Sequence, residues 1–404
     1  MLNACLIGLG QRGYNLSRDL FSKSAELNVV SICDIYEDRL ERAAELYVKA
    51  GKEKPLCFTN YKDALNVAKI DVAMIFSDWN THAEIAIYCM EKGIPVGSEV
   101  GCEYTLENCY NLVRTQERTG TPYMLMENCC WDKEEMLVTA MARKGMFGTI
   151  VHCQGSYSHD LRREIVYGHV KRHYRFDNYL NRCCDQYPTH DLGPIAKILD
   201  INRGNRILTV SSFATKSVGL EEYIKTLPDA TDEMKNARFK QGDIVTSVLT
   251  CANGETIVLR IDTCLPRFYS RDFTIRGTKG MYTVDTNSFF FDGQEHGYNK
   301  KEQFNNAENY YEEFLPKIWK EATPEVLAAG HGGMDYHCYT TFFNAIKNNL
   351  PMPVDVYDSA TWQAVSVLSE LSVINGGAPQ QMPDFTNGKW YQRKRLDVYP
   401  FNND

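Results

Sequence analysis

Short apolar segments rich in β-branched residues alternate with longer amphipathic segments from the first residues to about residue 125, and this alternation constrains the fold more than any other feature. We expect strands at 4–9, 27–33, 72–76, 95–98 and 123–126, and helices at 14–22, 37–49, 82–92 and 106–119. Strands that alternate with helices along a chain favour a parallel sheet covered by helices. The sequence therefore predicts an α/β domain with a doubly wound parallel sheet.

The pattern changes after a further expected helix at 133–144. Strand patterns follow at 150–158, 207–215, 244–250, 256–264, 270–276 and 281–284, interrupted by one helix after Thr189 and followed by helices at 335–347 and 359–375. Asn253 and Gly254, a dipeptide typical of β-hairpins, join two of these strands. We expect a nucleotide-binding domain at 1–127 and an α+β domain with a mostly antiparallel sheet at 128–404. The polar stretch 292–309 is expected to be a surface loop.

Composition excludes several classes of protein. The formal net charge of -8 is the opposite of the Lys and Arg excess that nucleic-acid binding requires. No apolar run reaches membrane-spanning length, and the first expected strand begins too early to follow a signal peptide. The 14 cysteines show no framework spacing, which favours free thiols in a reducing compartment. We expect a cytoplasmic protein without nucleic-acid or membrane partners.

A glycine-rich segment between the first expected strand and the first expected helix predicts a dinucleotide site. Its sequence, GLGQRG at 8–13, has the strand–turn–helix context that the GxGxxG pattern requires. Such glycines let backbone N–H groups approach a pyrophosphate. Asp34 ends the second strand about 20 residues later, where a carboxylate binds the adenosine ribose hydroxyls and repels a 2′-phosphate. NAD is the expected cofactor, bound by Gly8, Gly10, Gln11, Arg12, Gly13 and Asp34.

Polar residues after later strands extend this expected site. Asn80 and His82 follow the third strand, and Glu99 follows the fourth. Ligands bind at the carboxyl ends of the strands in sheets of this kind. Helix capping or packing is the alternative role for these residues. We expect cofactor contacts from Asn80, His82, Glu99 and Asn128.

Five tyrosine and histidine side chains form a second expected site. Tyr157 and His159 are two residues apart on a strand, so their side chains point to one face of the sheet. Tyr187 and His190 are three residues apart at the start of a helix, and therefore can share one helical face. Tyr269 follows the segment 264–268. Packing is the alternative role for each; together they are the expected catalytic residues.

These motifs resemble those of the glucose-fructose oxidoreductase and inositol dehydrogenase (Gfo/Idh/MocA) superfamily over nearly the whole chain. The resemblance implies an N-terminal Rossmann domain, then a substrate-binding domain with an open-faced sheet that forms contacts between subunits of a homo-oligomer. Dehydrogenases of that superfamily usually carry Glu-Lys-Pro where this chain has Glu99-Val100-Gly101. They usually carry Asp four residues before a catalytic His, where this chain has Gln186 before His190. The usual proton-handling pair for dehydrogenation is therefore incomplete.

A subgroup with the same departures fits better. Six segments, in the same order along the chain, resemble the NAD-dependent glycosidases of glycoside hydrolase family 109, typified by bacterial α-N-acetylgalactosaminidase. They are YSHDLR at 157–162, YPTH at 187–190, NRG at 202–204, PRFYS at 266–270, GTKG at 277–280 and HGGMD at 331–335. This chain has Asp191 where the commoner pattern after the histidine has Gly. The resemblance implies an N-acetylhexosaminidase with tightly bound NAD.

The resemblance implies a reaction in which NAD is reduced and then reoxidised, so the cofactor is unchanged at the end. Oxidation of the sugar at C3 by NAD makes the C2 proton acidic, a base removes it, and the enolate expels the substituent at C1. Water then adds at C1 and the bound NADH reduces C3. We expect Tyr157 to deprotonate C2, His159 and His190 to transfer hydroxyl protons or bind the sugar, and Tyr187 and Tyr269 to position it. These roles can be exchanged among the five, and both α- and β-glycosides can follow this route.

Other interpretations stay open at this point. An NAD-dependent sugar or cyclitol dehydrogenase or epimerase, or a non-catalytic sugar or dinucleotide sensor, would use the same fold. His331 and His337 flank a glycine-rich turn, but no third ligand follows at a metal-site spacing, so no metal is expected. The basic run 162–175 would be a loop over the sugar site, a subunit contact or a solvated face.

Overall fold

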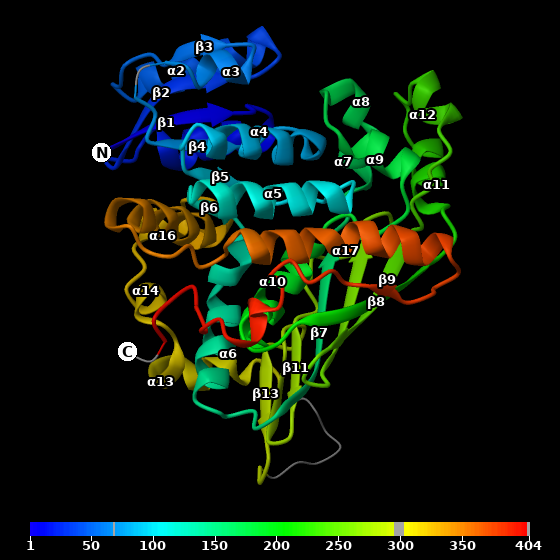
Figure 1. Ribbon diagram of the computed structural model, residues 1–404. Helices are drawn as coiled ribbons and strands as arrows, with labels where there is room; N and C mark the ends of the chain where they lie inside the picture. The colour runs from blue at the N-terminus through cyan, green and yellow to red at the C-terminus, as the bar shows by residue number, and fades with distance from the viewer. Residues whose placement is uncertain (68, 295–302, 402–404) are drawn as a thin grey trace. The chain divides into compact units, whose positions relative to one another are not determined.

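The computed structural model describes residues 1–67, 69–294 and 303–401, which form two compact units (Figure 1). The first unit is Met1–Asp132 with Glu321–Ala360, and the second is Lys133–Lys320 with Thr361–Asp404. By its contacts, the segment 321–360 belongs to the first unit although it lies far along the chain. The functional boundary expected after residue 127 stays a prediction. The stretch 292–309 lies in part outside the described residues.

The first unit contains a six-stranded sheet in the order β3-β2-β1-β4-β5-β6. All of its neighbouring strands are parallel. The order reverses between β1 and β4, and ligands bind at the carboxyl ends of the strands at such a point. The predicted doubly wound sheet is therefore confirmed. Its strands are β1 (Leu2–Ile7), β2 (Leu27–Cys33), β3 (Leu56–Phe58), β4 (Val72–Ile75), β5 (Val96–Ser98) and β6 (Tyr123–Leu125).

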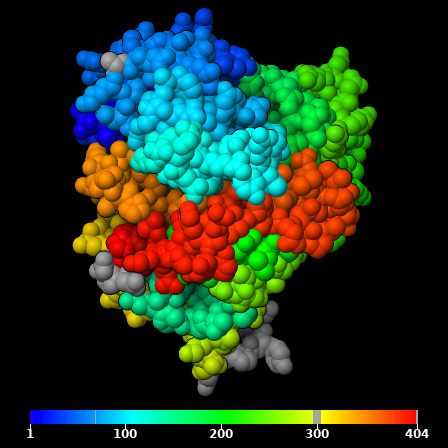
Figure 2. All heavy atoms as spheres, in the orientation of Figure 1, coloured from blue at the N-terminus to red at the C-terminus, as the bar shows by residue number. Residues whose placement is uncertain are grey.

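Helix α5 shows common capping residues at both of its ends. In α5, the Thr105 side chain accepts a hydrogen bond from the Asn108 N–H, and Gly120 ends the helix at φ 67°. Helices α4 and α5 pack side by side and form a continuous surface in Figure 2. The helices are α1 (Gln11–Leu16), which continues as the π-helical turn Ser17–Phe21, α2 (Glu37–Lys49), α3 (Tyr61–Ala64), α4 (Trp79–Glu91), α5 (Leu106–Thr119), the short η2 (Asn128–Trp131), α15 (Pro324–Leu327), the turn η5 (His331–Gly333) and α16 (Met334–Asn348).

The second unit contains an eight-stranded sheet in the order β13-β12-β11-β7-β10-β9-β8-β14. Strands β7 and β10 are parallel, and the other pairs are antiparallel. The predicted mostly antiparallel sheet and the hairpin at Asn253-Gly254 are confirmed. The strands are β7 (Ile150–Ser158), β8 (Ile207–Ala214), β9 (Ile244–Cys251), β10 (Thr256–Asp262), β11 (Thr274–Gly277), β12 (Gly280–Thr283), β13 (Ser288–Phe291) and β14 (Gln380–Gln381).

One helix, α10 (Pro188–Ile198), packs closely on β7 and β10. A Cβ atom at Gly155 would lie 2.0 Å from the backbone oxygen of Asp191, so only glycine allows this approach. The close contact brings the first turn of α10 to the strand that carries Tyr157. Other helices of this unit are α6 (Lys133–Arg143), α7 (Arg162–Val166), α8 (Gly168–Lys171), α9 (Arg175–Asn181), α11 (Gly219–Lys225), α12 (Asp232–Asn236), α13 (Tyr311–Phe314), α14 (Lys317–Lys320) and most of α17 (Val356–Ile374).

Two expectations differ from the structure. The strand expected at 270–276 starts only at Thr274, because Asp272 adopts φ 47° and pairs with Arg260, which bends the chain. The basic run 162–175 is mostly helical instead of a loop: α7 and α8 cover most of it, a short turn follows at 172–174, and α9 begins at Arg175.

Two further expectations can be compared with the structure. All 14 cysteines are free, as expected. Among the described residues, no helix is long and apolar enough to cross a bilayer.

Candidate functional site

The glycine segment joins β1 to α1 in a tight turn, in which Gly8 and Gly13 have no room for a side chain. Gly8 adopts φ 94°, and a Cβ atom there would lie 2.5 Å from the Phe76 backbone. A Cβ atom at Gly13 would lie 2.1 Å from the Gly8 oxygen. Gly10 has more room, with the nearest atom 3.6 Å away on Arg39. The turn therefore presents bare backbone at the start of α1, which suits a pyrophosphate.

Asp34 lies directly after β2 and is bound to this turn. Its carboxylate accepts hydrogen bonds from the N–H groups of Leu9 (2.7 Å) and Tyr36 (3.0 Å). The Arg39 guanidinium lies 3.6 Å from the same carboxylate. Each carboxylate oxygen can accept a further hydrogen bond. The position and the charge of Asp34 therefore fit the ribose role that the sequence predicts.

Three expected cofactor residues join one buried network instead of standing apart. The Arg12 guanidinium makes two hydrogen bonds to the Asp335 carboxylate, at 2.7 and 2.8 Å, and a third to Glu99 at 3.0 Å. Asn128 donates to Asp335 (2.7 Å), and the Tyr339 hydroxyl donates to Glu99 (2.7 Å). The Arg12 charge is therefore paired with the carboxylates of Glu99 and Asp335. Cofactor contact by Arg12, Glu99 and Asn128 stays a prediction.

The network fixes the charge of its members. Burial would raise the pKa of the Asp335 carboxyl, but the Arg12 cation and its hydrogen bonds lower that pKa well below the usual range. The same anions raise the pKa of Arg12 against the opposing effect of burial. His331 places its Nδ1 2.9 Å from the same Asp335 carboxylate. The role of Asp335 was not predictable from the HGGMD motif, because its partner Arg12 lies 323 residues away.

The start of α4 carries two further expected cofactor residues. Asp78, not Asn80, caps the helix by accepting from the Asn80 N–H (3.2 Å), and the Asn80 side chain is exposed. The His82 Nε2 lies 3.0 Å from the Ser77 carbonyl oxygen. Burial lowers the pKa of His82 to about 4, so this imidazole is neutral at pH 7. Gln11 opens α1 as an exposed residue.

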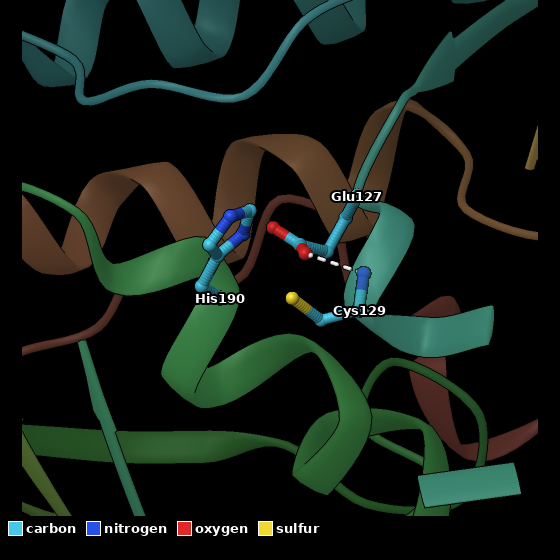
Figure 3. A group of neighbouring side chains, drawn as sticks. All are labelled: Glu127, Cys129 and His190. Carbon is cyan, nitrogen blue, oxygen red and sulfur yellow. Dashed lines mark hydrogen bonds between the residues drawn. The ribbon is translucent and has the colours of Figure 1, made fainter. Parts of the chain in front are cut away.

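A buried carboxylate precedes Asn128. Glu127 is fully buried and accepts a hydrogen bond from the Cys129 N–H at 3.0 Å, which starts η2 (Figure 3). Figure 3 also shows His190 on the first turn of α10. The turn at Glu127 directs Asn128 toward Asp335, because η2 packs against α16.

The second unit brings all five expected catalytic side chains into one cluster. The Tyr157 ring lies 4.4 Å from the Tyr187 ring and 5.5 Å from the His190 ring, centre to centre. Tyr187 and His190 are 4.7 Å apart. His159 lies 5.3 Å from Tyr269 and 6.3 Å from Tyr157. Tyr157 is therefore the centre of the cluster, and Tyr269 is its exposed edge.

Two charged residues, Arg175 and Glu164, belong to this cluster although the sequence did not predict them. Arg175 is buried, and its guanidinium carbon lies 5.1 Å from the Tyr187 ring centre and 5.9 Å from that of Tyr157. Its Nε lies 2.8 Å from Glu164. Burial would raise the pKa of Glu164, but Arg175, His173 and His159 lower it, so Glu164 is an anion. The basic run was the only signal, and its sequence does not reveal which cation turns inward.

A hydrogen bond from Arg271 fixes the position of the Tyr269 hydroxyl. Arg271 Nη1 donates to this oxygen at 2.9 Å. The same guanidinium is fixed by a buried pair of hydrogen bonds to Glu135, at 2.6 and 2.7 Å. The hydrogen bond from Arg271 orients the Tyr269 hydroxyl, which can act as a donor as well as an acceptor. Such a fixed hydroxyl suits recognition of a sugar oxygen.

Comparison with known proteins places the chain in a family. Residues 131–392 match the model of the "Glycosyl hydrolase 109, C-terminal domain", and residues 2–126 match that of the "Oxidoreductase family, NAD-binding Rossmann fold". A glycosyl hydrolase family 109 protein of Stenotrophomonas maltophilia is 38% identical, with 98% of this chain and 91% of that protein covered. An alpha-N-acetylgalactosaminidase of Tannerella forsythia is 35% identical, with 98% and 88% covered.

Solved structures show the same fold at lower identity. A levoglucosan dehydrogenase in complex with NADH and levoglucosan superposes with a TM-score of 0.68 at 17% identity, covering 95% of this chain and 100% of that one. The first unit thus has both the fold and the backbone turn of an NAD-binding domain, and its cofactor is NAD. On the matched residues and the identities to its relatives, the chain belongs to glycoside hydrolase family 109, within the Gfo/Idh/MocA superfamily.

Proposed function

We propose that this protein cleaves N-acetylhexosaminides, and α-N-acetylgalactosaminides in particular, by reversible oxidation of the sugar at C3. The observation that carries the proposal is the cluster around Tyr157, in which a phenol faces a tyrosine, an imidazole and a buried guanidinium. Two relatives at 35% and 32% identity carry the name alpha-N-acetylgalactosaminidase, which supports the choice of sugar.

The glycine turn and Asp34 would hold NAD in the first unit, through backbone N–H groups and the ribose-facing carboxylate. When bound, NAD supplies the hydride acceptor for C3 of the sugar and returns the hydride after the glycosidic bond has broken. The chain itself supplies only the proton transfers and the positioning. Usual glycosidases place two carboxylates on either side of the bond, whereas this cluster is built from phenols and imidazoles.

Tyr157 takes the proton from C2 in this proposal. The Arg175 guanidinium attracts negative charge on the Tyr157 oxygen, which favours the phenolate that a base requires. The rings of His190 and His159 lie 5.5 and 6.3 Å from the Tyr157 ring, where they can accept a hydroxyl proton or donate to the sugar. Tyr187 packs its ring on Tyr157 and orients it. Tyr269 donates from its fixed hydroxyl to a sugar oxygen.

The choice of sugar can be tested with paired substrates. Nitrophenyl α-N-acetylgalactosaminide should be cleaved, and the matched α-galactoside, which lacks the acetamido group, should be cleaved much more slowly. Equal cleavage rates for the two substrates would contradict the preference for N-acetylhexosamines, but the protein would still be a glycosidase.

Cofactor preference provides a second test, at Asp34. Replacing Asp34 with Ser removes the anion that opposes a 2′-phosphate and leaves Arg39, 3.6 Å from that carboxylate, to attract it. We expect the ratio of NADP to NAD affinity to rise by roughly tenfold or more, measured by calorimetric titration of nucleotide-free protein. The double variant Asp34→Ser/Arg39→Ala is the control and should lose the gain. An unchanged ratio in Asp34→Ser would contradict the ribose role of Asp34.

We also propose that the protein is a homo-oligomer assembled through the open face of the eight-stranded sheet. Along β9 and β10 every second residue is buried, while the alternate residues Val248 and Val258 pair across the two strands on the other face and remain partly exposed. Phe213 on the same face is 58% exposed. A wide sheet face of this kind favours a second copy as its cover.

Oligomerisation is tested by placing charge on that face. The double variant Val248→Lys/Val258→Lys should sediment as a monomer, while a matched pair on the exposed α2 surface, Glu41→Lys/Glu45→Lys, should sediment like the unchanged protein. If Val248→Lys/Val258→Lys sediments like the unchanged protein, the proposed interface is contradicted.

We propose a cytoplasmic location and a role in carbohydrate metabolism. The 14 free thiols support the location, because such thiols persist in reducing compartments. Fractionation of the native cells checks it.

A further inference from the structure

The turn η5 brings one exposed histidine to the Arg12 network of the first unit. His331 Nδ1 lies 2.9 Å from Asp335 Oδ2 and 3.2 Å from Arg12 Nη1. The backbone of the turn approaches the same carboxylate, because a Cβ atom at Gly330 would clash with Asp335 Oδ2. All of these residues belong to the first unit. The imidazole is therefore held at one of its two nitrogens.

The contact with Asp335 decides which nitrogen of His331 carries the hydrogen. Asp335 is paired with the Arg12 cation and is ionised, so its oxygens can only accept hydrogen bonds. A contact of 2.9 Å between Nδ1 and such an oxygen requires a hydrogen on Nδ1. In a neutral imidazole the other nitrogen, Nε2, then has a lone pair. Nε2 of His331 is therefore a hydrogen-bond acceptor.

This acceptor is accessible to a ligand. The His331 side chain is 56% exposed, and Nε2 has no hydrogen-bond partner within residues 1–67, 69–294 and 303–401. His331 also adopts φ 42°, which is uncommon for a residue other than glycine. Uncommon backbone conformations are frequent at ligand-binding sites. The turn thus presents an oriented acceptor, and its natural ligand is a group with a hydroxyl or N–H donor.

The network that holds His331 lies at the carboxyl ends of the strands in one half of the six-stranded sheet. Glu99 directly follows β5, and Asn128 follows β6 by three residues. Each half of such a sheet binds one nucleotide of the dinucleotide. Asp34, after β2, assigns the adenosine to the half formed by β1, β2 and β3. The nicotinamide nucleotide, whose ribose carries hydroxyl donors, is then expected at the half that holds His331.

We infer that His331 binds NAD, with Nε2 accepting a hydrogen bond from a hydroxyl of the nicotinamide ribose. Asp335 is the positioning residue, because it orients the imidazole through Nδ1. Arg12 connects this pair to the glycine turn, so one network fixes both the backbone that faces the pyrophosphate and the histidine that faces the ribose. The inference requires NAD binding but not glycoside cleavage, so a failure of the proposed function would leave it standing.

The first experiment compares NAD with AMP as ligands of His331→Asn. Asparagine tolerates positive φ and keeps a nitrogen near the position of Nδ1, but it has no atom at the position of Nε2. The affinity for NAD should fall about three- to tenfold, the usual effect of one hydrogen bond, in calorimetric titrations of nucleotide-free protein. The affinity for AMP, which lacks the nicotinamide ribose, should not change. An unchanged NAD affinity, or equal losses for NAD and AMP, would overturn the inference.

Two further variants separate the acceptor from its surroundings. His331→Gln places an amide oxygen near the position of Nε2 and should keep more of the NAD affinity than His331→Asn does. Glu325→Gln changes an exposed residue of α15, which packs against η5, and should bind NAD like the unchanged protein. If His331→Gln binds NAD as weakly as His331→Asn, the acceptor role is contradicted.

An NAD analogue that lacks both hydroxyls of the nicotinamide ribose identifies the group that His331 binds. The unchanged protein should bind the analogue more weakly than NAD, and His331→Asn should bind the analogue as well as the unchanged protein does. A loss in His331→Asn that persists with the analogue would overturn the inference. If His331→Asn does not fold, equal affinities of the unchanged protein for NAD and for the analogue would overturn it.

Discussion

Replacing Tyr157 with Phe is expected to lower kcat for glycoside cleavage by about a hundredfold to ten-thousandfold, the usual contribution of a general base. The variant keeps the ring that packs against Tyr187 at 4.4 Å and against His190 at 5.5 Å. It loses only the oxygen that faces the Arg175 charge. The fold of the second unit should therefore persist while the proton transfer from C2 is lost.

Two measurements separate this loss from general damage. Solvent deuterium should enter C2 of the sugar with the unchanged protein and should not enter with Tyr157→Phe. Tyr167→Phe is the matched control, because Tyr167 belongs to the same unit and bonds Asp229 instead of the cluster. Exchange at C2 that continues in Tyr157→Phe would show that another member of the cluster is the base.

Replacing Asp335 with Asn is expected to lower the free energy of unfolding by about 3 kcal/mol, because breaking a buried ion pair leaves its partner without compensation. Asp335 is almost fully buried and accepts hydrogen bonds from both Arg12 and Asn128. Its lowered pKa means that this stability is present above about pH 4 and is lost as the pH falls below that value. The difference between variant and unchanged protein should therefore shrink in acid.

Denaturation by urea, followed by circular dichroism, measures this effect. Asp19→Asn is the matched control: Asp19 pairs with Arg18 on the surface of the same unit, and such pairs contribute less than about 1 kcal/mol. Equal losses for Asp335→Asn and Asp19→Asn would mean that the Arg12 network does not stabilise the glycine turn.

Local patterns in the sequence were enough to predict most elements. The strand at 27–33 and the helices at 37–49 and 106–119 have the predicted bounds, because their periodicity and end signals agree. The strand β3 escaped prediction because it has only three residues, two of them exposed. The strand β13 was also missed, since its run of phenylalanines does not alternate with polar residues. Short elements of this kind are defined by their neighbours in the sheet.

The candidate site shows the same limit. Spacing predicted that Tyr157 and His159 share one sheet face and that Tyr187 and His190 share one helical face, while the approach of the two pairs was implied only by the family resemblance. The structure brings Tyr157 and His190 together because α10 packs on β7. Arg175 and Glu164 could not be assigned to the cluster, because three short helices decide which charges of the basic run turn inward. The pairing of Asp335 with Arg12 could not be predicted, because the two residues are 323 positions apart and no local sequence pattern indicates that they meet. Long-range pairing of charges is the part that required the structure.

The central claim is that the glycosidic bond is broken by elimination after oxidation at C3, with no net change in the cofactor. The most direct test incubates the protein with a panel of nitrophenyl α- and β-glycosides in deuterated water at catalytic NAD, and follows the product by mass spectrometry. The account predicts cleavage with one deuterium at C2 and no accumulation of NADH. NADH that accumulates without cleavage would contradict it and indicate a sugar dehydrogenase, and cleavage without deuterium at C2 would contradict the elimination route.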